Sequence, residues 1–245
     1  MESGGVFAQL GEHFAIDLPG ARAVFTTRRG GCSIGPYSSL NLGIFTDDDR
    51  SSVKRNRAAL AAALGTGTVR FVHQVHGTEV RRITGNGPEP AEPPRVDGQA
   101  TDQPGVALAA LVADCLPIAV AGRGAVAMLH AGWRGLAAGV VDAGVRAVRE
   151  IGAQGELSAA IGPGAGGCCY EVGPEVHSAF SDLAEAHVGA NLDLKAIAAD
   201  RLHRAGVATV YDLGLCTICC NAALLFSHRR DHGVTGRQAG IAWLT

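Results

Sequence analysis

Two segments decide how this chain can be interpreted, Ala113–Ile118 (ADCLPI) and Met128–Gly135 (MLHAGWRG). Each lies at the end of a short apolar run, VALAALV before the first and AVAML leading into the second. Runs of that length are typical of buried β-strands. If both strands end at the same edge of a sheet, Cys115 of the first segment lies beside His130 of the second. The two segments therefore predict a thiol and an imidazole in one site.

A third segment, residues 71–77 (FVHQVHG), adds His73 and His76 after another short β-branched run. Two imidazoles and one thiolate at strand ends form a Cys/His2 metal site with one coordination position open. The three segments are far apart in sequence, so their spacing also allows a free buried cysteine and hydrogen-bonded core histidines. The residue pattern alone leaves both interpretations open.

Composition excludes several classes of protein. A chain of 245 residues can form one large or two small domains with a sizeable core, and its 47% hydrophobic content is typical of soluble globular proteins. The net charge of −2 offers no field that would attract nucleic acid or an anionic membrane. Because the N-terminal residues show no basic segment before an apolar run, we expect no secretory signal, and seven reduced cysteines in the cytoplasm.

The periodicity of apolar residues predicts a mixture of strands and helices without a strict βαβ rhythm, which indicates an α/β fold with a mixed central sheet. The expected strands are residues 22–28, 69–75, 79–83, 106–112, 125–129, 157–161, 207–213 and 240–244. The expected helices are residues 51–64, 136–151, 174–184 and 192–205.

Several motifs occur in the order found in one protein family. They are TTRRGGCSIGPYSSLNLG (26–43), HQVHG (73–77), ADCLPI (113–118), HAGWRG (130–135), CCYEVG (168–173), SHRRD (227–231) and TGR (235–237). Together they resemble the bacterial laccase-domain family, whose members are also called polyphenol oxidases, peptidoglycan-editing factors and purine nucleoside phosphorylases. The resemblance runs from about residue 21 to 244. It implies a single domain over residues 1–245 and a three-layer α/β/α fold related to toxin deamidases that use a Cys/His pair.

The resemblance also implies a catalytic metal site on His76, Cys115 and His130. His73 falls at a position where the family varies, so we leave it out of the ligand set. Thiolate and imidazole donors suit Zn²⁺, with a fourth position for water or substrate, and Cu²⁺ is an alternative. The sequence departs from the family pattern at His228, where an aromatic residue is more usual, and at the Cys219-Cys220 pair.

Members of this family cleave adenosine, inosine or methylthioadenosine with phosphate, and some deaminate adenosine. The resemblance therefore implies small-molecule purine nucleosides and phosphate as partners, and we expect a monomer. Phosphorolysis requires fixed guanidinium groups that hold a phosphate dianion. The candidate substrate-binding residues are Asn41, Arg57, Arg134, Arg229, Arg230 and Arg237. An exposed arginine without function, or an asparagine bonded to its own loop, is the alternative for each.

Two other activities stay open. A multicopper oxidase needs His-x-His pairs, and none occurs among the nine histidines, although a single copper at the Cys/His2 site would allow phenol oxidation. A Cys/His hydrolase active in peptidoglycan editing would use Cys115 as nucleophile and His130 as base, without metal.

The remaining polar motifs have structural alternatives. Asp114 is a candidate acceptor that orients His76 or His130, and its alternative is a cap at a strand end. Cys216 and Cys219 form one CxxC pair, but a second pair is missing. We therefore expect the cysteines at positions 168, 169, 216, 219 and 220 to be ordinary buried thiols.

Overall fold

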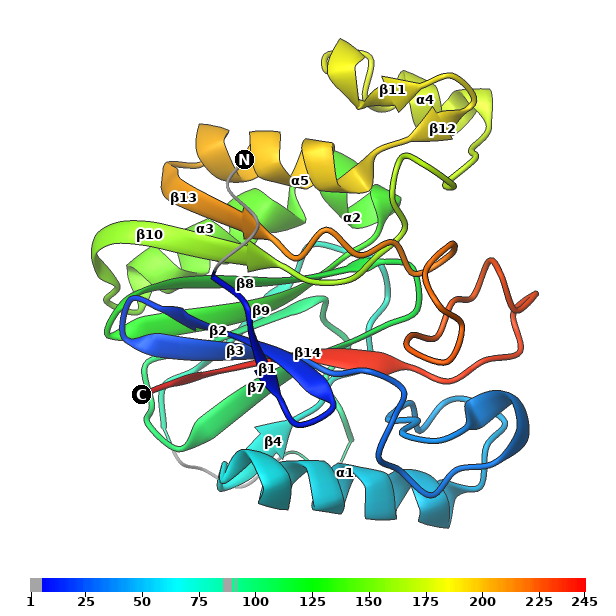
Figure 1. The fold of residues 1–245 in the computed structure, drawn as a ribbon. Helices are drawn as coiled ribbons and strands as arrows, with labels where there is room; N and C mark the ends of the chain where they lie inside the picture. The colour runs from blue at the N-terminus through cyan, green and yellow to red at the C-terminus, as the bar shows by residue number, and fades with distance from the viewer. Residues whose placement is uncertain (1–5, 86–89, 91) are drawn as a thin grey trace.

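Two six-stranded sheets pack face to face, with helices on both outer sides (Figure 1). The structure is a computed structural model that describes residues 6–85, 90 and 92–245. The first sheet runs β1 (Ala8–Leu10), β2 (His13–Leu18), β3 (Ala21–Phe25), β14 (Gln238–Leu244), β7 (Val106–Val112), β4 (Thr68–Arg70). The second runs β13 (Val207–Asp212), β10 (Gln154–Ile161), β8 (Leu116–Arg123), β9 (Ala125–Ala131), β6 (Gly98–Thr101), β5 (Val80–Ile83). A two-stranded hairpin of β11 (His187–Val188) and β12 (Asn191–Leu192) lies beside helix α4 (Pro174–Ser178).

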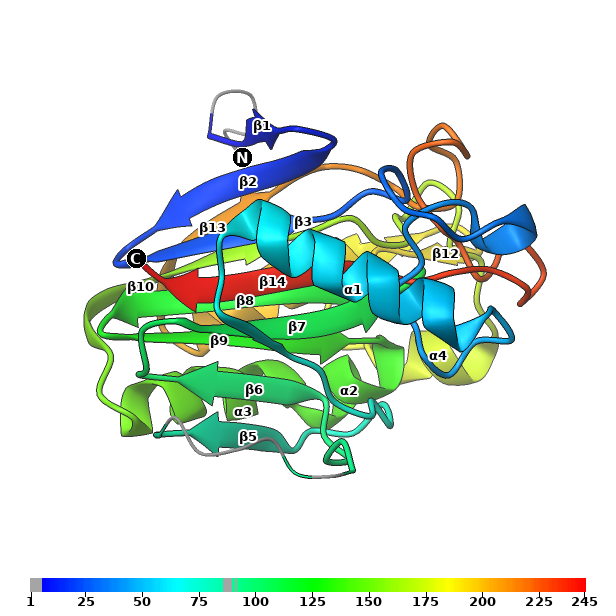
Figure 2. The same ribbon diagram turned by 90° about the horizontal axis from the view of Figure 1, so that it is seen from below.

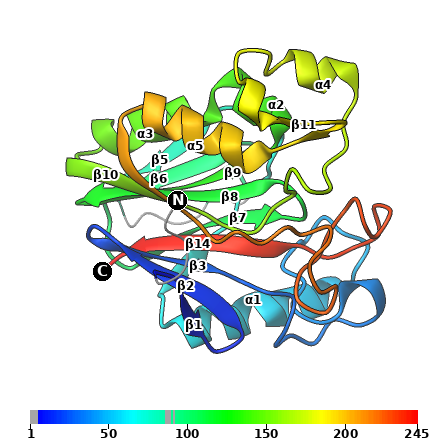
Figure 3. The same ribbon diagram turned by 45° about the horizontal axis from the view of Figure 1, so that its top comes forward.

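The predicted α/β class with mixed sheets is confirmed, but two central sheets are present where the sequence analysis expects one. Both sheets combine parallel pairs, β4 with β7 and β5 with β6, with antiparallel pairs. Helix α1 (Arg50–Leu64) covers the first sheet, and α2 (Trp133–Ala138), α3 (Val140–Glu150) and α5 (Leu194–Arg204) cover the second (Figures 2 and 3). The order of layers is therefore α/β/β/α.

Strand β7 explains why a second sheet is needed. Successive strand residues point to opposite faces, and both faces of β7 are buried. Val106, Leu108 and Ala110 contribute to the core between the sheets. Ala107 and Ala109 contribute to the core under α1. An apolar strand without a polar face must be covered twice, here by the second sheet and by a helix.

The helices follow their capping residues. Helix α1 is capped at its N-terminus by Asp49, whose carboxylate accepts hydrogen bonds from two backbone N–H groups, and at its C-terminus by Gly65, which has a φ of +65°. The helix expected over residues 136–151 is divided into α2 and α3, because Gly139 adopts a φ of +95° between them. In the part of the chain that the structure describes, no helix combines the length and the apolar character needed to cross a bilayer.

The chain crosses between the sheets at the edge where the motif residues gather. Residues 113–115 connect β7 of the first sheet to β8 of the second. The strand expected over residues 69–75 stops at Arg70, and residues 71–79 leave the sheet as a loop toward the same edge. Strand β9 delivers His130 there as well. This edge therefore collects all three predicted ligands.

Replacing Gly144 with alanine tests how closely α3 packs on β9. An ideal Cβ at Gly144 would lie 2.4 Å from Cδ1 of Leu129, closer than two carbon atoms can approach. Alanine favours an exposed helix over glycine by about 1 kcal/mol, but overpacking typically costs about 1–3 kcal/mol. We expect Gly144→Ala to lower the free energy of unfolding measured in urea. The double variant with Leu129→Ala should show a favourable coupling, and a more stable single variant would contradict this packing.

Candidate metal centre

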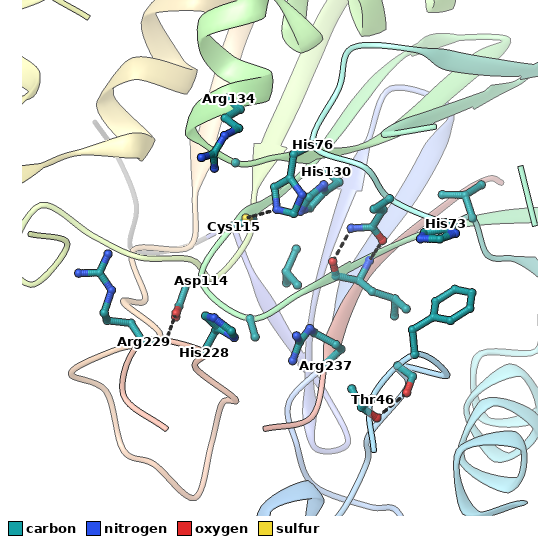
Figure 4. Close-up of a pocket in the computed structure, with 18 of the residues that line it drawn as sticks. Thr46, His73, His76, Asp114, Cys115, His130, Arg134, His228, Arg229 and Arg237 are labelled. Atoms are coloured by element: carbon teal, nitrogen blue, oxygen red, sulfur yellow. Dashed lines mark hydrogen bonds between the residues drawn. The ribbon is translucent and has the colours of Figure 1, made fainter. Parts of the chain in front are cut away.

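Three segments bring the predicted ligands together (Figure 4). The candidate donor atoms of His76, Cys115 and His130 all lie within 4.8 Å of one another. Nε2 of His76 is 3.8 Å from Sγ of Cys115, and nitrogen and sulfur on one tetrahedral zinc would be about 3.6 Å apart. The two imidazole rings meet edge to face, with centroids 4.9 Å apart. The donor set and its spacing therefore fit one metal ion.

Asp97, which the sequence analysis did not identify, holds the ligands in place. Its carboxylate accepts a hydrogen bond from Nδ1 of His130 at 2.8 Å. The same carboxylate accepts the backbone N–H groups of residues 75, 76 and 77. Because Nδ1 of His130 is engaged, Nε2 is the nitrogen left to bind metal. The sequence analysis expects no strand directly after Asp97, and a lone aspartate in the Val96-Asp97-Gly98 segment is too common to single out.

The ionised forms of Cys115, His130 and Asp97 stabilise one another. Burial would raise the pKa of Cys115, but the His130 charge and hydrogen bonds from both imidazoles lower it to about 6. Burial would lower the pKa of His130, but Cys115 and Asp97 raise it to about 9. Burial likewise opposes ionisation of Asp97, and its hydrogen bonds with His130 and backbone N–H groups bring its pKa down to about 2. At neutral pH the metal-free site therefore holds a thiolate beside an imidazolium.

The backbone around the ligands adopts strained or crowded conformations. His76 and Asp114 have φ values of +61° and +94°, which residues with a side chain rarely adopt. A Cβ at Gly132 would lie 2.9 Å from Sγ of Cys115 and 3.1 Å from Cδ2 of His76. The glycine of the HAGWRG motif therefore leaves room for the ligand side chains. Strain of this kind is typical of functional sites.

Asp114 does not orient a ligand histidine, in contrast to the hypothesis from the sequence. Its carboxylate accepts hydrogen bonds from Oγ1 of Thr217 at 2.6 Å, Oγ of Ser227 at 2.7 Å and the backbone N–H of Arg229 at 2.6 Å. These donors belong to two loops near the C-terminus, far from Asp114 in sequence. Asp114 therefore fixes those loops beside Cys115, and Asp97 performs the orienting role.

A cavity of about 440 Å³ opens onto the three ligands, a size typical of small-molecule sites. Three of the predicted substrate-binding residues, Arg134, Arg229 and Arg237, line this cavity. Figure 4 shows them at different positions around the metal ligands. Aromatic and imidazole side chains also line the cavity, and they are Phe45, His73, Trp133, Tyr170 and His228.

The other three predicted substrate-binding residues do not belong to the cavity lining. Asn41 is fully buried, and its side chain bonds Thr46, Asp48 and the backbone N–H groups of residues 43 and 237. Arg57 donates twice to the carbonyl of residue 42 and lies over the Phe71 ring. Arg230 donates to the carbonyls of residues 217 and 225 and pairs with Asp231. These contacts indicate structural roles.

Replacing Asp97 with asparagine tests whether it orients His130. The variant loses the carboxylate charge opposite His130 and one of the acceptor oxygens that hold the 75–77 loop. Loss of such an outer hydrogen bond typically weakens metal binding by about 10–100-fold. Zinc affinity measured by competition with a chromophoric chelator should fall by that factor. Asp102→Asn, at the other end of β6, serves as control, and equal affinity of the two variants would exclude this role.

Zinc binding should also release a proton. Between about pH 6 and pH 9, Cys115 is already a thiolate and only the proton on His130 must leave. The affinity should therefore rise about tenfold per pH unit in this range and fall as the pH is lowered. Calorimetry in two buffers of different ionisation enthalpy should give about one proton released, a release absent from Cys115→Ala. A pH-independent affinity would contradict the thiolate–imidazolium pair.

The chain is similar to known proteins over most of its length. A family model described as multi-copper polyphenol oxidoreductase laccase matches residues 22–245. A purine nucleoside phosphorylase of Geobacillus stearothermophilus is 40% identical and covers 91% of this chain and 90% of its own length. Another purine nucleoside phosphorylase, from Streptomyces coelicolor, is 42% identical, and the match covers 92% of this chain and 96% of that protein.

Two solved structures are similar to this chain over nearly its whole length. The crystal structure of YlmD from Geobacillus stearothermophilus superposes with a TM-score of 0.87 at 37% identity, over 98% of both chains. A Neisseria meningitidis structure superposes with a TM-score of 0.83 at 35% identity, over 95% of this chain and 99% of that one. The family model spans nearly all of the described fold, including the three ligands and the cavity. The chain therefore belongs to the multi-copper polyphenol oxidoreductase laccase family.

Proposed function

We propose that this protein is a metal-dependent purine nucleoside phosphorylase that converts a purine nucleoside and phosphate to the free base and ribose 1-phosphate. One observation carries the proposal: a Cys/His2 centre and three guanidinium groups line the same cavity. A metal centre alone would suit many reactions, and an arginine cluster alone would suit any anion. Their combination, in a chain whose relatives are named purine nucleoside phosphorylases, favours transfer to phosphate.

The arginines supply the phosphate site. Nη1 of Arg229 donates to the carbonyl of residue 171, and Nη1 of Arg237 donates to the carbonyls of residues 235 and 236. Among the described residues these fixing bonds use only the Nη1 group of each side chain, and a guanidinium has five N–H donors. Arg134 is exposed and stacks on Trp133, with Cζ 4.3 Å from the ring centroid. Held in this way, the three side chains can bind a dianion with little further loss of freedom.

Aromatic and imidazole rings in the same cavity suit the purine. Phe45 is 62% exposed although it is a large apolar side chain, and its ring stacks on His73 with centroids 4.6 Å apart. Both residues line the cavity. An exposed aromatic face beside an imidazole offers a stacking surface for a planar base. His73 then contributes to substrate binding and not to the metal.

Zinc is the metal that the donor set fits best, because thiolate and imidazole ligands leave one tetrahedral position open. A metal bound to His76, Cys115 and His130 would supply Lewis acidity to substrate atoms in the cavity. The same ligands would accept Cu²⁺, so incidental phenol oxidation is part of this proposal for copper-loaded protein. Deamination of adenosine is a further activity that a base held beside the centre would allow.

The cavity is lined by residues from distant parts of the chain, which indicates how the protein is organised. The lining runs from Gly43 to Arg237, so the site draws on nearly the whole chain. This supports a single functional unit over residues 1–245, and we propose that it acts as a monomer. We also propose a cytoplasmic location, since a thiolate ligand must stay reduced.

A metal-independent hydrolase is the second candidate. Cys115, His130 and Asp97 are arranged as a nucleophile, a base and a group that orients the base. In its favour, the thiolate is already formed near neutral pH without metal. His76 argues against it, because a second imidazole 3.8 Å from the sulfur suits a metal ligand better than a free nucleophile.

Product analysis separates these candidates. Protein with a defined zinc content is incubated with adenosine, with and without phosphate, and the products are separated by chromatography. We expect adenine and ribose 1-phosphate only when phosphate is present, and a loss of at least about 100-fold in Cys115→Ala, because even removal of an outer hydrogen-bond partner of a metal ligand typically costs about 10–100-fold. Cys32→Ala, an exposed thiol outside the cavity lining, should retain full activity.

Each other outcome identifies a different reaction. Inosine without adenine would move the proposal to deamination at the same centre. No turnover of adenosine, inosine or methylthioadenosine would exclude the phosphorylase. Retention of turnover after removal of all metal, with loss on thiol alkylation, would favour the Cys/His hydrolase.

A further inference from the structure

A second group of cysteines gathers away from the three ligands, and we call it the four-cysteine cluster. Cys168 and Cys169 lie in the segment that follows β10, and Cys216 and Cys219 lie in the segment that follows β13. Their four Sγ atoms all lie within 4.8 Å of one another, with 3.6 Å between Cys168 and Cys219. Figure 1 shows the two segments, light green and orange, side by side on the same side of the sheets, and Gly164 forms a bridge with Cys216.

These thiols are not the ordinary buried cysteines that the sequence analysis expects. Cys168 and Cys219 are exposed, Cys169 is half-buried, and only Cys216 is buried. Clustered exposed thiols gain nothing from hydrophobic burial, which is the usual reason for a free cysteine in a core. Another property must therefore account for four sulfur atoms in one place.

The spacing of the cluster matches a single tetrahedral ion. Four thiolates at 2.3 Å from a zinc ion would lie about 3.8 Å from one another, and the Cys168–Cys219 distance is close to that value. A disulfide needs sulfur atoms about 2.05 Å apart and would use only two of the four thiols. An iron–sulfur cluster with several iron atoms would hold the sulfurs farther apart. One ion bound by four thiolates accounts for all four positions.

The backbone around Cys216 is prepared for a thiolate. The N–H of Gly166 donates to its Sγ at 3.4 Å. The N–H groups of Ile218 and Cys219, two and three residues after Cys216, are also directed at this sulfur. A turn that directs N–H groups at the first sulfur of a CxxC pair suits metal ligation, because ligands must be deprotonated.

We propose that Cys168, Cys169, Cys216 and Cys219 bind one zinc ion in a second, structural site. Four thiolates complete the tetrahedral coordination and leave no position for substrate, which distinguishes this site from the Cys/His2 centre. The site joins two segments that are almost fifty residues apart. An ion with four protein ligands from two segments stabilises the fold by linking them.

The zinc would also support one wall of the catalytic cavity. Tyr170, which lines the cavity, directly follows Cys169. Thr217 directly follows Cys216 and donates its hydroxyl hydrogen bond to Asp114 beside Cys115. Loss of the second ion should therefore lower stability strongly and affect catalysis only through the position of this wall.

The metal content of purified protein tests the proposal. Protein prepared under reducing conditions, with zinc but without chelator, is analysed by mass spectrometry for zinc per chain. We expect about two ions in the unmodified protein and one fewer in Cys219→Ser, whose position is exposed enough to accept serine. Cys220→Ser is the matched control and should bind as much zinc as the unmodified protein, because its thiol contacts the carbonyls of residues 217 and 221 outside the cluster.

A second measurement keeps all four thiols intact. In Cys115→Ser the Cys/His2 centre is disabled, so added Co²⁺ should report the cluster alone through the intense absorption of tetrahedral cobalt thiolate. Equal zinc content in Cys219→Ser and the unmodified protein, or no such absorption, would overturn the proposal. A disulfide between Cys168 and Cys219 in the reduced, zinc-supplied protein would overturn it too. The zinc measurement compares Cys219→Ser with the unmodified protein, and the cobalt measurement uses a chain without Cys115. Both results are therefore independent of whether the Cys/His2 centre binds zinc or cleaves nucleosides.

Discussion

The site depends on one carboxylate. Asp97 is only 1% exposed, and it accepts hydrogen bonds from three consecutive backbone N–H groups and from the imidazole of His130. A buried charge is stable only when it is satisfied in this way. The hydrogen bonds hold His76 in a left-handed backbone conformation that costs energy on its own, and they fix which nitrogen of His130 faces the thiol. Without Asp97 the two histidines would lose their common support.

Close packing of the two sheets brings the third ligand to the same place. Residues 113–115 cross from one sheet to the other, so the distance between the sheets determines where Cys115 lies. Small residues keep that distance short: a Cβ at Gly240 would lie 2.6 Å from the Cβ of Pro117 and 2.9 Å from the sulfur of Met128. Asp114 then bonds loops close to the C-terminus, which bring Arg229 into the cavity. The arrangement of the candidate ligands is thus a consequence of layer packing.

Sequence reasoning recovered the parts whose signal is local. The run VALAALV coincides with β7, and residues 51–64 lie within α1, because an apolar run and a capping aspartate are visible in the chain itself. The three metal ligands followed from motifs, and the structure brings them together. Strands β2, β6 and β8 were missed, and so was the division of the strands into two sheets, since apolar alternation does not reveal what covers a buried face. Asp97 and the four-cysteine cluster were missed because their partners are distant in sequence.

The central claim is that Asp97 directs Nε2 of His130, together with His76 and Cys115, toward one metal ion. Crystals of the zinc-loaded protein measured at the zinc absorption edge test it directly. We expect an anomalous peak within bonding distance of Sγ of Cys115 and of Nε2 of His130 and His76, with Nδ1 of His130 still hydrogen-bonded to Asp97. A peak on Nδ1 of His130 with Asp97 displaced, or no peak among these three residues, would contradict it.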